Sequence, residues 1–133
     1  MRKQIFTNGC FDLLHPGHLS LLEYCSSLGD VIVGLNSDGS VRRLKGIERP
    51  IWPVEMRKYA LESCRFVNKV VVFEEDTPET LIRELRPDLI VKGGEYEGGY
   101  VVGQEVAPVK FFRPVWNVST TEVVRVIREG GLA

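Results

Sequence analysis

The alternation of strand-like and helix-like segments constrains the fold of this chain most strongly. Short apolar runs rich in β-branched or aromatic residues predict five strands, at 5–7, 30–36, 69–73, 88–91 and 109–112. Apolar spacing and cap residues predict helices at 17–28, 37–44, 53–63, 77–85 and 120–129, with Thr77 as a cap and Gly130-Gly131 as a stop. Alternating elements imply right-handed βαβ units, and hence a mostly parallel sheet with helices on both faces.

The stretch 9–18, with the sequence GCFDLLHPGH, links the first predicted strand to the first predicted helix and holds both histidines of the chain. Such a turn is a ligand site in open parallel sheets, because free helix N-terminal amides can hold an anion. His15 and His18 indicate phosphate chemistry, since imidazoles donate to phosphoryl oxygens and can be cationic near neutral pH. Two alternatives stay open. One is a polar turn with incidental histidines; the other is a metal site, although zinc needs a third ligand and only Cys10 and Asp12 are near.

Length and charge narrow the classes of function. The chain has 133 residues, which suits one domain spanning 1–133 with one sizeable core. Seventeen basic and eighteen acidic residues give a net charge of −1, so composition supports neither a nucleic-acid nor a membrane surface role. No apolar run is long enough to span a bilayer, and no signal peptide pattern is present. Three cysteines without zinc-like spacing favour a reduced, cytoplasmic setting.

The run Gly9-Cys10-Phe11-Asp12 followed by His15-Pro16-Gly17-His18 resembles the signature of the cytidylyltransferase-like nucleotidyltransferases. The resemblance implies a Rossmann-like, three-layer α/β/α fold with a five-stranded, mostly parallel sheet. In that superfamily the paired histidines hold the α-phosphate of a nucleoside triphosphate. His15 and His18 are therefore expected to be catalytic, and three residues before them to contact the nucleotide: Gly9, Cys10 and Phe11.

Lys45 lies in the most basic stretch of the chain, 42–49, one βα unit after the histidine turn. Such a run is usually a solvated face. A lysine on a loop can also approach a polyphosphate as a point charge, and the setting suggests a loop that closes over substrate. Lys45 is therefore a third candidate catalytic residue.

Five further charged residues are candidate substrate contacts on the strength of the resemblance: Asp12, Asp38, Arg57, Arg65 and Arg113. From the residues alone, Asp38 is equally a capping residue at the end of the second strand. Arg57 alone reads as helix-surface charge, and Arg65 as a partner of the helix C-terminal dipole.

The remaining candidates follow the fourth and fifth predicted strands. Lys92 and Gly93 follow the fourth predicted strand, and glycine there allows the backbone to approach a base or sugar closely. Ser119, Thr120 and Thr121 open the last helix as a second anion site, suited to the β- and γ-phosphates. Ordinary N-capping by Ser or Thr can hold at the same time.

Three segments, 36–51, 73–78 and 91–96, resemble the adenylyltransferases that act on D-glycero-D-manno-heptose 1-phosphate. Three departures point elsewhere: Trp52, the short loop after Tyr96, and Arg113, which resembles an arginine of the glycerol-3-phosphate cytidylyltransferases. Because loops vary easily, three concordant segments outweigh these departures. The sequence predicts ATP with a heptose 1-phosphate in preference to CTP with glycerol 3-phosphate.

The reaction expected from the resemblance is attack of a sugar or polyol phosphate on the α-phosphorus of a nucleoside triphosphate, with release of pyrophosphate. Such chemistry needs positioning and charge stabilisation, and an anionic attacking phosphate needs no general base. Mg²⁺ is expected to bridge phosphate oxygens, with water and nucleotide supplying most of its ligands. No metal ligand is assigned among the residues, and the resemblance allows a homodimer. A nucleotide-binding module without turnover is the alternative class.

Overall fold

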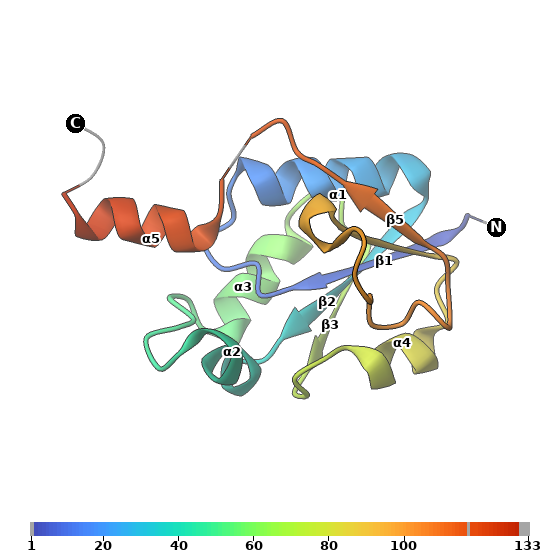
Figure 1. The fold of residues 1–133 in the computed structure, drawn as a ribbon, viewed down its shortest axis with the longest axis horizontal. Helices are drawn as coiled ribbons and strands as arrows, with labels where there is room; N and C mark the ends of the chain where they lie inside the picture. The colour runs from blue at the N-terminus through green and yellow to red at the C-terminus, as the bar shows by residue number, and fades with distance from the viewer. Residues whose placement is uncertain (1, 117, 131–133) are drawn as a thin grey trace.

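Five parallel strands form one sheet, in the order β3-β2-β1-β4-β5, in the computed structural model, which describes residues 2–116 and 118–130 (Figure 1). The expected α/β fold class is therefore confirmed, and within the described residues every strand pair is parallel. The strands are β1 (Gln4–Gly9), β2 (Asp30–Asn36), β3 (Lys69–Phe73), β4 (Leu89–Gly93) and β5 (Val109–Phe112).

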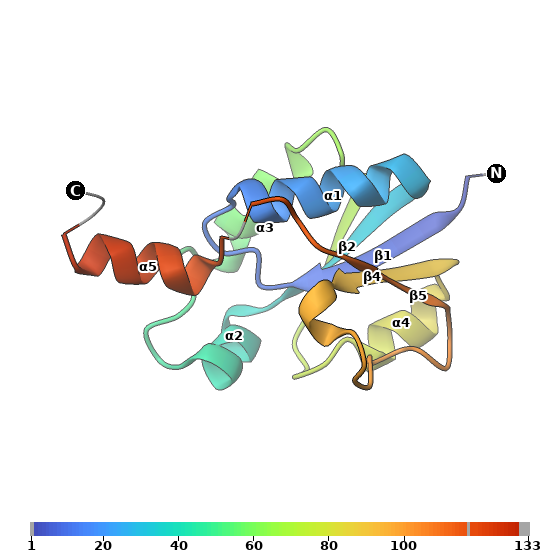
Figure 2. The same ribbon diagram turned by 45° about the horizontal axis from the view of Figure 1, so that its top comes forward.

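Helices cover both faces of the sheet, which gives the three layers (Figure 2). On one face, α1 and α3 pack against side chains such as Ile5 and Val33, and on the other α4 packs against Phe6 and Ile90. Two faces can be buried because alternate residues of each strand point to opposite sides. The helices are α1 (Pro16–Leu28), α2 (Asp38–Lys45), α3 (Val54–Glu62), α4 (Glu79–Leu85) and α5 (Thr120–Arg128), with a 3₁₀ turn η1 (Gly94–Tyr96).

Several expected boundaries differ by one or two residues from those of the structure, and two of these differences concern residues named above. Pro78, rather than Thr77, is the N-cap residue of α4, because the carbonyl of Pro78 accepts the first helical hydrogen bond from Ile82. Strand β4 continues to Gly93, so Lys92 and Gly93 end the strand instead of following it. At the end of α5, Gly130 has a φ of 98°, which suits glycine at a helix stop, and Gly131 lies outside the described residues.

The order of the strands places an opening beside β1. The chain builds outward from β1 through β2 to β3, and then returns to β4 and β5 on the other side of β1. The ladder between β1 and β4 covers only two pairs, Ile5–Leu89 and Phe6–Ile90, so the last three residues of each strand are not paired with one another. Ligands bind at such a switch point in open parallel sheets. Helix α5 lies beyond this carboxyl end of the strands (Figure 1).

None of the described helices combines the length and the apolar composition that crossing a bilayer requires.

Candidate active site

A cavity of about 980 Å³ opens at the carboxyl ends of β1 and β4. It gathers residues that are far apart in the sequence: the histidine turn after β1, the end of α2, the end of β4 and the first turn of α5. The expected site residues that line it are Gly9, Cys10, Phe11, His15, His18, Lys45, Lys92, Gly93, Arg113, Ser119, Thr120 and Thr121.

The two histidines cap α1 reciprocally. Nδ1 of His15, the N-cap residue, accepts from the backbone N–H of Gly17 at 3.1 Å and, at a longer 3.4 Å, from that of His18. Nδ1 of His18 in turn accepts from the backbone N–H of His15 at 3.4 Å. An imidazole nitrogen that accepts carries no proton, so both rings hold their proton on Nε2. A Cβ at position 17 would lie 2.9 Å from Cε1 of His15, which explains the glycine between them.

Burial makes both imidazoles neutral donors in the free protein. The rings stack with their centroids 3.7 Å apart. Burial lowers the pKa of His15, and burial together with the neighbouring His15 lowers the pKa of His18 to about 3. The expectation that either ring is cationic near neutral pH is therefore wrong for the free protein. Nε2 of His15 is buried and has no hydrogen-bond partner among the described residues, so its N–H group is a donor without an acceptor.

The depressed pKa of His18 predicts a loss of stability in acid. An unfolded histidine titrates near 6.5. Because the folded pKa lies below that value, the contribution of neutral His18 is complete above pH 6.5 and decreases as the pH falls toward about 3. The free energy of unfolding should fall by about 2 kcal/mol on this account between pH 7.5 and pH 5.

Urea unfolding of the wild type and of His18→Asn at both pH values measures this loss. The asparagine oxygen can still accept from the backbone N–H of His15, and it does not titrate. Carboxylates contribute equally to both proteins, so the variant should lose about 2 kcal/mol less than the wild type. Equal losses in the two proteins would contradict the neutral, buried state of His18.

The first turn of α5 forms the opposite wall of the cavity. Ser119 is the N-cap residue, and its hydroxyl accepts from the backbone N–H of Glu122 at 3.1 Å. The hydroxyl of Thr120 donates to the carbonyl oxygen of Asp12 at 2.7 Å, which ties α5 to the histidine turn. First-turn amides have no partner within their own helix and carry the positive end of its dipole. This wall and the exposed Lys45, the last residue of α2, can together attract an anion.

The end of β4 supplies a third wall. Burial lowers the pKa of Lys92, whose ammonium lies 4.3 Å from the centroid of the Tyr96 ring. Arg113 donates from Nη2 to the carbonyl oxygen of Gly94 at 2.9 Å and pairs with Glu97 at 3.3 Å. A side chain at position 94 would overlap that of Arg113, so the glycine allows this close approach. Arg113 thus supports the 94–97 turn as well as lining the cavity.

Asp12 does not line the cavity, which corrects its expected contact with substrate. The carboxylate is fully buried and accepts from the backbone N–H of Ile51 at 2.6 Å and that of Trp52 at 3.1 Å. Its acceptor sites are occupied because the 49–52 segment folds over it. Asp12 therefore positions that segment rather than contacting a ligand.

Arg57 and Asp38 also form a structural group outside the cavity. Nη1 of Arg57 donates to the carbonyl oxygens of Cys10 and Asn36, both at 2.8 Å, and Nε donates to that of Trp52 at 2.9 Å. Nη2 pairs with the Asp38 carboxylate at 2.8 Å. The Arg57 side chain has no exposed surface, so the expected contact of Arg57 and Asp38 with a substrate phosphate does not fit this geometry.

Arg65 is far from the cavity, because it lies in the connection from α3 to the amino end of β3. Its guanidinium is 4.9 Å from the centroid of the Phe66 ring, and the residue is exposed. The expected substrate contact is wrong for Arg65, since the cavity is at the carboxyl ends of the strands. Arg49, from the basic stretch 42–49, and Asn36, at the end of β2, also line the cavity. The described residues contain no group of three or more His, Cys, Asp or Glu side chains with metal-binding geometry.

Comparison with known proteins places this arrangement in a family. The chain is 51% identical over 129 residues to the "Bifunctional protein HldE" of Nitratiruptor sp., which is 96% of this chain and 28% of that protein. It is 56% identical over 107 residues to the protein of the same name from Helicobacter pylori, which is 80% of this chain and 23% of that protein. The chain thus spans about a quarter of the length of these relatives.

A solved structure shares the fold. The lipopolysaccharide core biosynthesis protein from Thermoplasma volcanium GSS1 superposes with a TM-score of 0.69 at 23% identity, over 89% of this chain and all of that one. The model of the family described as "Cytidylyltransferase-like" matches residues 6–126, which include the histidine turn, Lys45 and the first turn of α5. The chain belongs to the cytidylyltransferase-like family.

Proposed function

We propose that the chain is an adenylyltransferase domain that joins ATP to a sugar 1-phosphate, such as a heptose 1-phosphate, and releases pyrophosphate and an ADP-sugar. The observation that carries the proposal is the pair of stacked, neutral imidazoles of His15 and His18, which line the cavity at the switch point. Family membership and the similarity to the HldE relatives support nucleotidyl transfer.

The reaction exchanges one bond at the α-phosphorus for another. An oxygen of the sugar phosphate attacks the α-phosphorus, and the bond from that phosphorus to the bridging oxygen of the β-phosphate breaks. Pyrophosphate leaves with the electron pair of that bond. The attacking oxygen is already anionic, so no side chain has to remove a proton.

The histidines act on the α-phosphate. Donors that are already in place stabilise the charge that develops on non-bridging oxygens without reorganisation. Nε2 of His15 has no protein acceptor to give up when phosphate binds, so its full hydrogen-bonding capacity is available to the ligand. Lys45 and the first turn of α5, with Ser119, Thr120 and Thr121, hold the outer phosphates. Cys10, Phe11, Lys92 and Gly93 form the walls around the nucleoside.

Mg²⁺ is expected to reach this site as an ion carried by the nucleotide. The Asp12 carboxylate already binds two backbone N–H groups, and that of Asp38 pairs with Arg57. Phosphate oxygens and water would therefore hold the ion, as Mg²⁺ prefers. When bound, Mg²⁺ supplies neutralisation of the polyphosphate charge.

CTP with glycerol 3-phosphate is the second candidate, because Arg113 lines the cavity. Its bonds to Gly94 and Glu97 give Arg113 a structural reason to be there, which weakens that alternative. The three segments that resemble heptose enzymes therefore favour ATP and a heptose 1-phosphate. A homodimer, which the family resemblance allows, and a cytoplasmic setting stay predictions.

A matrix of pyrophosphate release tests the proposal: ATP or CTP, each with a heptose 1-phosphate or glycerol 3-phosphate, with and without Mg²⁺. The expected result is the highest kcat/KM for ATP with the heptose 1-phosphate, with activity only when Mg²⁺ is present. A site shaped for several hydroxyl groups should discriminate strongly, because a substrate that lacks them leaves buried polar groups unpaired. Higher efficiency with CTP and glycerol 3-phosphate would reverse the assignment, and no pyrophosphate with any pair would indicate a module without turnover.

A further inference from the structure

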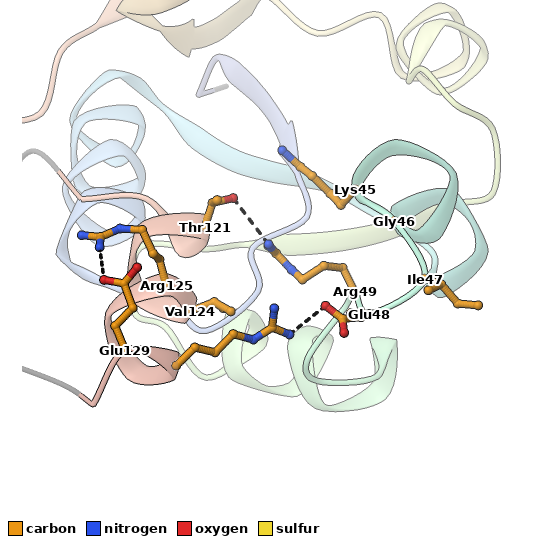
Figure 3. A pocket seen from close by; sticks show the side chains of 10 residues that line it. Lys45, Gly46, Ile47, Glu48, Arg49, Thr121, Val124, Arg125 and Glu129 are labelled. Carbon is orange, nitrogen blue, oxygen red and sulfur yellow. Dashed lines mark hydrogen bonds and ion pairs between the residues drawn. The ribbon is translucent and has the colours of Figure 1, made fainter.

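Arg49 is a largely buried cation at the boundary of two cavities. The second cavity, of about 540 Å³, lies between the 45–49 segment and α5 (Figure 3). Three residues line both cavities: Lys45, Arg49 and Thr121. Figure 3 shows the guanidinium of Arg49 directed toward Thr121, in the first turn of α5, and away from the body of the 45–49 segment. Only 11% of the Arg49 side chain is exposed.

The protein satisfies the Arg49 guanidinium poorly. Its Nη1 reaches Thr121 Oγ1 at 3.4 Å, a long distance for a hydrogen bond. Its Nε lies 3.4 Å from Oδ2 of Asp12, and this buried nitrogen has no hydrogen-bond partner among the described residues. The Asp12 carboxylate, in contrast, makes shorter bonds to two backbone N–H groups. Asp12 therefore orients Arg49 without using the hydrogen-bonding capacity of the guanidinium.

Nearby arginines are paired in a different way. Arg125 binds Glu122 and Glu129, and Arg128 donates to Glu48 at 2.9 Å. These side chains are about half exposed. A buried cation costs free energy unless it is both paired and hydrogen-bonded. Asp12 supplies the counter-charge of Arg49 but no hydrogen bond to Nε, so the guanidinium still has donor capacity for a further acceptor. An anion in the large cavity would supply it.

We propose that Arg49 binds the β- and γ-phosphates of the nucleotide, and the pyrophosphate formed from them, with Asp12 as its positioning residue. The inference rests on the proposed function and adds a phosphate-binding residue to it. A guanidinium presents several N–H donors in one plane and matches two phosphate oxygens at once. Arg49 lies beside the first turn of α5, so its donors face the β- and γ-phosphates, while the histidines hold the α-phosphate.

Binding measured without turnover tests this role. Isothermal titration compares the affinity of the wild type, Arg49→Met and the matched control Arg125→Met for ATP, AMP and inorganic pyrophosphate in the presence of Mg²⁺. Arg49→Met should bind ATP and pyrophosphate about 10- to 100-fold more weakly, the range expected for lost hydrogen bonds to a charged group. Its affinity for AMP should stay within about twofold, because AMP has no outer phosphates. Arg125→Met also removes one positive charge, from α5, and should leave the affinities for ATP, AMP and pyrophosphate unchanged.

Three outcomes would overturn the inference: unchanged ATP and pyrophosphate affinity in Arg49→Met, an equal loss for AMP, or an equal loss in Arg125→Met. If Arg49→Met fails to fold, Arg49→Lys replaces it, since lysine keeps the charge but not the planar set of donors. Arg49→Lys should also lose affinity for ATP and not for AMP. A wild type that binds ATP and pyrophosphate but transfers nothing in the substrate matrix would refute the proposed function while leaving this inference intact.

Discussion

Replacing His15 with asparagine should lower kcat by about 100- to 1,000-fold, the cost of removing one preorganised donor to a developing oxyanion. Asparagine is among the most favoured N-cap residues, and its side-chain oxygen can accept from the backbone N–H groups that Nδ1 of His15 now binds. The variant therefore keeps the cap of α1 and loses the Nε2–H group together with the ring that stacks on His18. Steady-state pyrophosphate release with saturating substrates measures the effect.

Two controls separate catalysis from folding in this experiment. The thermal midpoint of His15→Asn should stay close to that of the wild type, because the N-cap interaction is preserved. Ser20→Ala removes a hydroxyl that donates to the carbonyl of Gly17 in the same helical turn, outside the cavity, and should leave kcat within about twofold. A folded His15→Asn protein with nearly normal kcat would remove His15 from the catalytic group.

The histidine turn and the order of strands and helices could be predicted because both depend on residues close together in the sequence. The two histidines cap each other across three residues, so the whole interaction lies within one helical turn and within one sequence motif. The strands alternate with helices in a way that leaves one fold class, and the parallel sheet follows from short-range patterns and from connection rules. The N-cap role of Ser119 is local in the same sense, because its partner Glu122 is three residues away.

Long-range contacts explain where sequence reasoning was wrong. Asp12 meets Ile51 and Trp52 across about 40 residues, and Arg57 meets Cys10 across 47. The residues next to Arg57 in the sequence do not reveal whether its guanidinium bonds to backbone carbonyl oxygens or to the phosphate of a substrate. Arg65 was misplaced for a topological reason: it precedes a strand, and that end of the sheet faces away from the cavity. Closeness to a strand in the sequence does not place a residue at the site, because only the carboxyl ends of the strands face the cavity.

Arg49 is a residue of the site that sequence analysis did not single out. It lies in a basic stretch whose other arginines, Arg42 and Arg43, are exposed. The composition of the stretch gives no reason to separate these three arginines. Only the fold shows that Arg49 is directed inward beside Asp12. The distinguishing signal is the buried carboxylate after β1, which no spacing rule connects to position 49.

Arg57→Met should lower the free energy of unfolding by about 3–5 kcal/mol, the usual cost of removing one partner of a buried ion pair. The guanidinium donates to three backbone carbonyl oxygens, those of Cys10, Asn36 and Trp52, besides pairing with Asp38. Methionine fills most of the volume but supplies no donor, so these acceptors would be buried without partners. Urea unfolding at pH 7 measures the change.

Arg65→Met is the matched control, because it makes the same substitution at an exposed arginine, and it should change stability by no more than about 0.5 kcal/mol. Arg57→Lys should fall between the two, since a single ammonium has three donors and cannot span the four oxygens that the guanidinium reaches. The alternative, in which Arg57 contacts a substrate phosphate, predicts the opposite pattern. In that case Arg57→Met would keep the stability of the wild type and raise KM. Such a result would show that Arg57 binds substrate and is not a structural residue of the β1–α3 junction.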